Sequence, residues 1–186
     1  MLFRSYSERD VVHEERRLRT DSTPTGRFQE QFDSMFWASC GYSWPVIGWP
    51  SDLNSYTEEQ AQDYWNVYYR PGNLVGIVVG DFDPARAKAD ITRYFSRLDP
   101  GTRRPPPVVT LEVEQLAEQR MNAEGDFPPA VEIRYHTVPA GHVDSYPLDI
   151  LAEILNERTG RLYVGMVEGR GIAAGAQATS DTRKYA

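Results

Sequence analysis

Hydrophobic and polar positions in the first half of the chain predict three helices. Residues 7–19 are polar and charged, and the turn-forming run 21–24 ends this stretch. The second helix is predicted from a stripe at helical spacing, formed by Phe28, Phe32, Met35 and Phe36. The third begins with the capping box Thr-Glu-Glu-Gln at 57–60. We expect its buried face to consist of Ala61, Tyr64, Trp65 and Tyr68.

Four later segments have the pattern of β-strands. Residues 74–79 form a continuous apolar run, and residues 131–138 alternate between apolar and polar side chains. Strands are also predicted at 108–113 and 172–179. Strand patterns therefore alternate with helical ones along the chain.

Two more helices and one irregular segment complete this prediction. One helix is expected from about Pro84 to Leu98, with the proline near its first position. Another is expected over 144–156, with Leu148, Leu151 and Leu155 facing inward. Residues 40–53 are aromatic and rich in proline and glycine, which predicts an ordered loop that covers a small core.

A stiff, proline-rich run marks the expected domain boundary. Residues 99–107 hold four prolines and a glycine, so they suit neither a helix nor a central strand. We expect a linker at 101–107 between two domains, 1–100 and 108–186. The alternative is a proline-rich ligand for a recognition module, but the run lies between two structured stretches.

Composition and charge exclude some classes of function. The 186 residues carry a net charge of −7 and a pI near 5.0, which argues against nucleic acid as a partner. The single cysteine, Cys40, excludes an internal disulfide. No apolar run is long enough for a membrane span, and the first residues lack the apolar region of a signal peptide. Any signal would lie upstream of Met1, so the sequence does not predict a compartment.

Two carboxylates are the principal candidates for chemistry. Glu8 and Glu15 are seven residues apart, which places them on one face of the first predicted helix, two turns from each other. The alternative is an ordinary solvated helix face, on which Glu and Arg three or four residues apart form weak pairs.

The three histidines are weaker candidates. His13 lies two residues before Glu15, about 200° around a helix, so both could not easily hold one ion. His136 and His142 flank a Pro-Ala-Gly turn without a cluster of ligands, and we interpret them as loop residues.

Three motifs in this order resemble the M16 family of pitrilysin- and insulinase-like zinc metallopeptidases. They are the Glu-rich segment 8–17, Tyr-Ser-Trp-Pro-Val-Ile-Gly at 42–48, and Gly-Asp-Phe-Asp-Pro at 80–84. The second motif resembles bacterial members, which usually have His-Pro where this chain has Cys40 and Gly41. The resemblance extends from about Glu8 to Thr179.

The resemblance implies a zinc site to which this chain contributes one ligand. Glu15 matches the third zinc ligand, and Glu8 matches a residue that supports the site. The other ligands would be the two histidines of a His-x-x-Glu-His motif, whose glutamate acts as general base on a zinc-bound water. That motif belongs upstream of Glu15, and the 186 residues do not contain it. We therefore expect a fragment that lacks this segment.

The resemblance also implies a fold, a function and partners. The fold would be α+β, with helices packed on a mostly antiparallel sheet and both half-domains incomplete: the C-terminal part of the zinc-bearing half at 1–100, and the N-terminal part of the second half at 108–186. The parent protein would hydrolyse peptides or small proteins, aided by its other half-domains in cis or in a partner subunit. We expect the chain alone to be inactive. The alternatives are a non-catalytic M16-like structural or partner-binding subunit and an unrelated α+β binding module.

Overall fold

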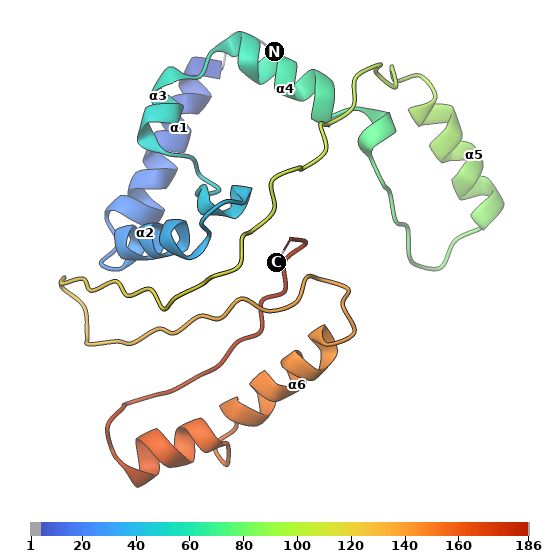
Figure 1. Ribbon diagram of the computed structural model, residues 1–186. Coiled ribbons are helices and arrows are strands. Elements are labelled where there is room, and N and C mark those ends of the chain that lie inside the picture. The colour runs from blue at the N-terminus through green and yellow to red at the C-terminus, as the bar shows by residue number, and fades with distance from the viewer. Residues whose placement is uncertain (1–4, 186) are drawn as a thin grey trace. The chain divides into compact units, whose positions relative to one another are not determined.

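Helices are the regular elements of the computed structural model, which describes residues 5–185 (Figure 1). Six of these helices are α-helical in the described part of the chain, and 3₁₀ and π segments lie between and after them. The elements are α1 (Ser5–Arg16), η2 (Arg17–Asp21), α2 (Gly26–Phe36), η3 (Gly41–Ser43), α3 (Pro50–Ser55), α4 (Glu58–Tyr68), η4 (Pro71–Asn73), α5 (Pro84–Phe95), α6 (Ser145–Asn156) and η5 (Tyr163–Gly169).

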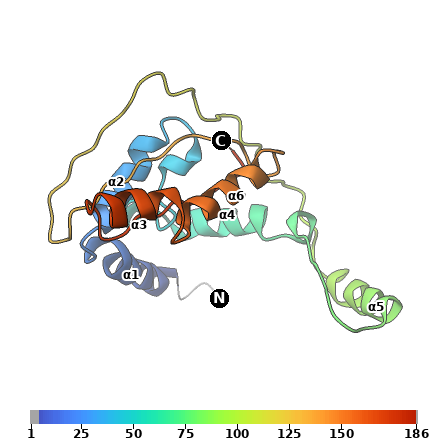
Figure 2. The ribbon, with the colours of Figure 1, turned by 90° about the horizontal axis from the view of Figure 1, so that it is seen from below.

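The expected α+β fold is wrong, because no strand or sheet is present among residues 5–185, and this part of the chain is all-α. The four predicted strands, at 74–79, 108–113, 131–138 and 172–179, are connections without regular structure instead. A strand is defined by the hydrogen-bonded ladder that it forms with a neighbour, and alternating side chains do not supply that neighbour. In both ribbon views these segments are drawn as thin tubes: the first three lie between helices, and the fourth follows the last helical segment (Figures 1 and 2).

Local signals in the sequence located most helices correctly. The capping box at α4 is confirmed: the Thr57 side chain accepts from the Gln60 amide at 3.2 Å, and the Gln60 side chain accepts from the Thr57 amide at 2.8 Å. Pro84 lies in the first turn of α5, as predicted. The expected loop at 40–53 is wrong in part, since it contains η3 and the start of α3.

The predicted inward faces of α4 and α6 are also wrong in part. Tyr64 and Trp65 of α4 are 55% and 51% exposed, and Val67 is the buried residue of this helix. Leu151 of α6 is 49% exposed. Along α4 the ring of Tyr64 stacks on that of Tyr68, and the ring of Trp65 stacks on that of Tyr69, the residue directly after the helix.

The chain forms two compact units, and each has its own small core. The first consists of Met1–Glu30 and Trp44–Val109. In it α1 contacts α3, and Leu53 and Val67 are buried. Arg103, from the proline-rich run, donates to both carboxylate oxygens of Asp63 on α4. This pair links the run to the helix, although both side chains are exposed to solvent.

The second unit consists of Gln31–Ser43 and Thr110–Ala186, so the division passes through α2. Its buried residues lie at the end of that helix and directly after it: Phe32 is in α2, and Trp37 and Cys40 follow it. Arg134 stacks over the ring of Phe32 at 4.8 Å, and the ring of His136 stacks on Phe36 with centroids 4.0 Å apart. Burial raises the pKa of the Cys40 thiol, which leaves it protonated and unreactive.

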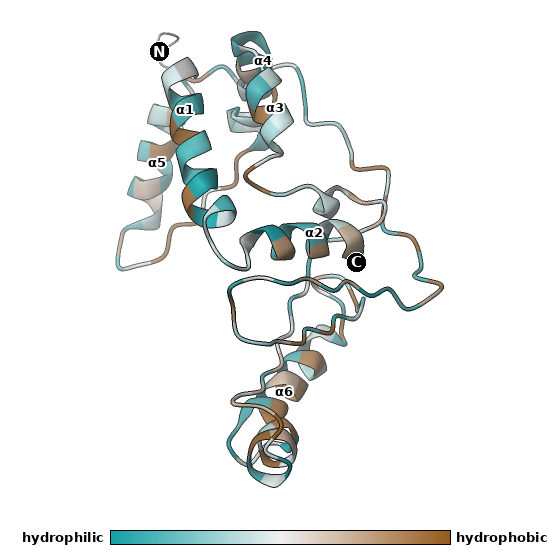
Figure 3. Cartoon of the chain, turned by 90° about the vertical axis from the view of Figure 1, so that its left-hand side faces the viewer, coloured by the Kyte–Doolittle hydropathy of each residue, from teal (hydrophilic) through white to brown (hydrophobic). Residues whose placement is uncertain are grey.

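Much of the apolar surface is open to solvent. We call residues 74–79, Leu-Val-Gly-Ile-Val-Val, the apolar segment; its five aliphatic side chains are each 57% or more exposed. Figure 3 shows hydrophobic stretches along the irregular connections as well as on the helices. No helix among residues 5–185 has the length and hydrophobicity that a membrane crossing requires.

Candidate functional site

Both candidate carboxylates lie on α1. Glu8 is in its first turn and exposed, and Glu15 is in its last turn and partly buried. Glu15 pairs with Arg19 one turn later, with 3.1 Å between its Oε1 and the Nη2 of Arg19. The Arg19 side chain is 78% exposed, so this ion pair is weak and easily exchanged. The Glu15 carboxylate therefore remains available as a ligand.

The described residues do not form a complete zinc site. A hydrolytic zinc ion needs three protein ligands and an open position for water. Within residues 5–185, no three His, Cys, Asp or Glu side chains come together in a way that could hold a metal ion. The donor chemistry of Glu15 suits zinc, but a single carboxylate does not bind it. The described residues therefore supply one candidate zinc ligand.

The residue after Glu15 is buried, which the sequence did not suggest. Arg16 is only 4% exposed. Its Nη1 and Nη2 donate to the two carboxylate oxygens of Glu30 at 2.6 and 2.7 Å, and Nη1 also donates to the carbonyl of Gly48 at 2.9 Å. In the sequence Arg16 is one of several arginines in a charged run, and only its distant partners distinguish it from the others.

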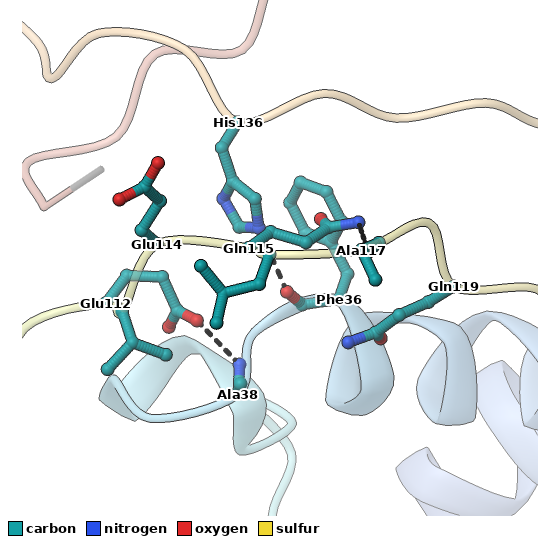
Figure 4. A pocket seen from close by; sticks show the side chains of 10 residues that line it. Phe36, Ala38, Glu112, Glu114, Gln115, Ala117, Gln119 and His136 are labelled. Carbon is teal, nitrogen blue, oxygen red and sulfur yellow. Dashed lines mark hydrogen bonds between the residues drawn. The ribbon is translucent and has the colours of Figure 1, made fainter.

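A pocket of about 310 Å³ lies in the second unit (Figure 4). It is lined by the end of α2, the connection at 112–119 and His136. Glu112 is its most strongly bonded member, since its carboxylate accepts from the amides of Ala38, Ser39 and Cys40 at 2.8, 3.2 and 3.0 Å. Burial raises the pKa of Glu112, but these amides outweigh that effect and leave it below its ordinary value.

The polar groups of this pocket serve structure. The Glu112 carboxylate is occupied by three amides, and Ser39 adds two more bonds to the same connection, one to the Leu111 carbonyl and one from the Val113 amide. His136 lies with its Nε2 3.2 Å from the carbonyl of Phe36. Its Nδ1 is buried without a hydrogen-bond partner among the described residues. The sequence predicted none of these contacts, because they join residues 70 to 100 positions apart.

The remaining histidines have separate surroundings. His13 lies in the last turn of α1. His142 belongs to the turn before α6, where its Nδ1 accepts from the Asp144 amide at 3.1 Å and its carbonyl accepts from the Ser145 amide at 3.0 Å.

Comparisons with known proteins agree with one another. Residues 55–185 match the family model described as Peptidase M16 inactive domain. The chain is 28% identical over 153 residues to a protein from Helicobacter pylori (strain ATCC 700392 / 26695) named Zinc protease PqqE, covering 81% of this chain and 34% of that protein. The fold of this chain is similar to the crystal structure of a protease from Helicobacter pylori, with a TM-score of 0.75 and 24% identity.

The match to that structure covers 97% of this chain and 45% of the other. The chain thus spans between a third and a half of the length of the two proteins it matches. The family model covers well over half of the 186 residues. By this match, the chain belongs to the M16 peptidase family.

Proposed function

We propose that this chain is a part of an M16 zinc metalloendopeptidase that hydrolyses peptides or small proteins, and that it contributes Glu15 as one ligand of the zinc ion. The observation that carries the proposal is the arrangement on α1, where two carboxylates share one face and Glu15 is half-buried beside an anchored arginine. Family membership and the name of the Helicobacter pylori relative support a zinc peptidase. Glu8 would support the site electrostatically.

The other donors would come from outside these 186 residues. Zinc in such a site supplies an activated water for hydrolysis, which needs two further ligands and a general base. None of the three histidines of this chain lies in a His-x-x-Glu-His motif. The isolated chain is therefore expected to bind zinc weakly and to cleave no peptide.

A second candidate is a non-catalytic M16 subunit that binds a partner. The observation that favours it is the family model itself, which describes an inactive domain. Such a subunit would pair with other M16 domains and need no zinc.

The genomic reading frame separates the two candidates. An in-frame His-x-x-Glu-His upstream of the Met1 codon supports the peptidase, whereas an in-frame extension without the histidines supports the non-catalytic subunit. Calorimetry of the purified 186-residue chain with Zn²⁺ should show weak binding only. Zinc-dependent, chelator-sensitive proteolysis by this chain alone would contradict the proposal that its donors are incomplete.

Substitutions in the longer polypeptide test the ligand directly. Glu15→Gln should abolish tight zinc binding, and Glu8→Gln should lower zinc affinity by about 10- to 100-fold, as is typical of residues that support a metal ligand. The matched control is Glu14→Gln, because Glu14 is exposed and pairs only with the neighbouring Arg17 among the described residues. Equal zinc affinity in the Glu14 and Glu15 variants would disprove the role of Glu15.

A further inference from the structure

One buried arginine joins four segments of the first unit. Arg16, at the end of α1, binds both oxygens of Glu30 on α2 and the carbonyl of Gly48 in the loop before α3. Its Nη2 also lies 3.5 Å from Asp21 at the end of η2. We call these four residues, Arg16, Asp21, Glu30 and Gly48, the Arg16 anchor. The bidentate pair gives it a fixed geometry, because the guanidinium plane must match the plane of the carboxylate.

The partners of Arg16 are themselves held in place. The Glu30 side chain is only 9% exposed. Gly48 has a φ of +85°, which glycine adopts far more readily than other residues, and its amide donates to the Pro45 carbonyl at 2.9 Å. This closes a tight turn that presents the Gly48 carbonyl to Arg16. The Glu30 carboxylate also raises the pKa of Arg16 further above its already high value, so the guanidinium stays charged at every accessible pH.

The anchor sets the rotation of α1 about its own axis. Successive residues of an α-helix are about 100° apart, so an inward Arg16 directs Glu15 to an adjacent face. Glu8, seven residues before Glu15, lies within about 20° of the same direction. The helix widens to a π segment directly after Arg16, and such local changes are frequent at functional sites. The orientation of the Glu8–Glu15 face therefore depends on where Arg16 is held.

Energetics favour orientation over stability as the role of the anchor. Desolvation offsets most of the attraction in a buried ion pair, and well-packed apolar residues often stabilise a protein as well or better. The Nε of Arg16 is also buried without an acceptor among the described residues, which is a further cost. A pair that contributes little net stability but has a strict geometry is suited to specifying one arrangement of its helices.

We infer that Arg16 is a positioning residue: it fixes the rotational setting of α1 and thereby directs Glu15 and Glu8 to a common site. The part of this inference that concerns the zinc ligand rests on the proposed function. The setting of α1 is a property of the described residues alone and can be measured without zinc.

Paired spin labels on α1 and α3 provide the test. Asp10 and Asn54 are exposed positions on these two contacting helices, and each can be replaced by cysteine in a Cys40→Ala background. The parent chain should give a single narrow distance distribution. Arg16→Met should shift or broaden this distribution. Arg16→Lys should do so to a smaller extent, because an ammonium group keeps the charge but cannot donate two parallel hydrogen bonds to the Glu30 carboxylate.

Arg27→Met is the matched control. Arg27 carries the same charge and lies 3.8 Å from Asp21, but its side chain is 72% exposed and outside the anchor. This variant should leave the distance distribution unchanged. Thermal unfolding of each variant is measured as well. A variant that only loses stability has a lower midpoint of thermal unfolding but keeps the parent distance distribution in its folded state.

Glu30→Gln keeps the inference testable if Arg16→Met does not fold, since it keeps the shape of the side chain and removes one acceptor. A folded Arg16→Met or Glu30→Gln chain with the parent distribution would overturn the inference. That result would leave Glu15 as a ligand candidate. Conversely, an unchanged zinc affinity in the Glu15 variant of the longer polypeptide would disprove the proposed function and leave the setting of α1 intact.

Discussion

The Arg16 anchor and the apolar segment belong to the same compact unit, but their side chains differ in burial in the opposite sense to their polarity. In the anchor, charged groups are buried and bonded to one another. In the apolar segment, aliphatic side chains such as Val75 and Val79 are 87% and 91% exposed. From residue 74 to 98 no described residue is buried. Hydrophobicity alone therefore does not decide which side chains of this unit are buried: a side chain is buried only where another segment of the chain packs against it.

Truncating one aliphatic side chain in each region should give the largest contrast. Leu53 of α3 is 9% exposed, so Leu53→Ala leaves a cavity and should lower the free energy of unfolding by about 2–5 kcal/mol. Ile77 of the apolar segment is 84% exposed, and Ile77→Ala should change the free energy of unfolding by less than about 0.5 kcal/mol. Urea unfolding of the 186-residue chain measures both.

A similar loss in the two variants would contradict the comparison. It would mean that Ile77 is buried in the folded chain in solution, for example against another molecule. Repeating the Ile77 measurement at several protein concentrations tests that explanation, since association makes the apparent stability depend on concentration.

The connection at 111–113 shows how a segment without regular structure can be fixed by polar contacts. The Glu112 carboxylate accepts hydrogen bonds from the three amides of residues 38–40. No side-chain contact of this kind reaches the apolar segment among the described residues. Glu112→Gln replaces one carboxylate oxygen with an amide group that cannot accept these bonds. We expect a loss of about 1–2 kcal/mol in the free energy of unfolding at neutral pH. Glu114→Gln, in the neighbouring exposed position, is the matched control and should have almost no effect.

Acid should remove the same contribution in the parent chain. The pKa of Glu112 in the folded chain is below its ordinary value of 4.5, so the carboxylate stabilises the fold above that pH. The contribution is lost as the pH falls below about 4.5 and through the folded-state pKa. The difference in stability between the parent and Glu112→Gln should therefore shrink across this range. A difference that stays constant down to pH 3 would show that the charge of Glu112 is not what holds the connection.

What the sequence predicted well was local. The Thr57 capping box and the position of Pro84 depend only on residues within one helical turn, and both are confirmed. The same reasoning predicted strands at 74–79 and 131–138 from side-chain patterns, and these were wrong because a ladder requires a second segment in register. The buried face expected on α4 was wrong in part for the same reason, since burial also requires a second segment, and Tyr64 and Trp65 remain 55% and 51% exposed.

Contacts between residues far apart in the sequence could not be predicted from local sequence patterns. Arg16, Arg17 and Arg19 look equivalent in the sequence, yet Arg16 is buried and the other two are exposed. The distinction arises from Glu30 and Gly48, which lie 14 and 32 residues away. The family resemblance was found from the order of motifs and is confirmed by the comparisons. The role of Glu15 as a zinc ligand stays a prediction.

The smallest expected effect concerns α5, which follows the apolar segment. None of its residues is buried, so its stability depends on local interactions. Its N-cap is Asp83, whose Oδ1 accepts from the amides of Ala85 and Arg86 at 2.8 and 3.0 Å. Asp83→Ala should cost α5 about 1 kcal/mol, a roughly fivefold loss of amide-exchange protection confined to this helix.

The matched control for the cap is Asp81→Ala, which removes the same charge two residues earlier, outside the capping position. It should leave exchange in α5 unchanged. Hydrogen exchange read by mass spectrometry on peptides from α5 and α4 makes the comparison, because α4, unlike α5, contains a buried residue, Val67. If Asp83→Ala lowered protection equally in both helices, α5 would be coupled to the fixed part of the unit. In that case α5 would behave like the helices that the Arg16 anchor joins, and only the apolar segment would differ from them.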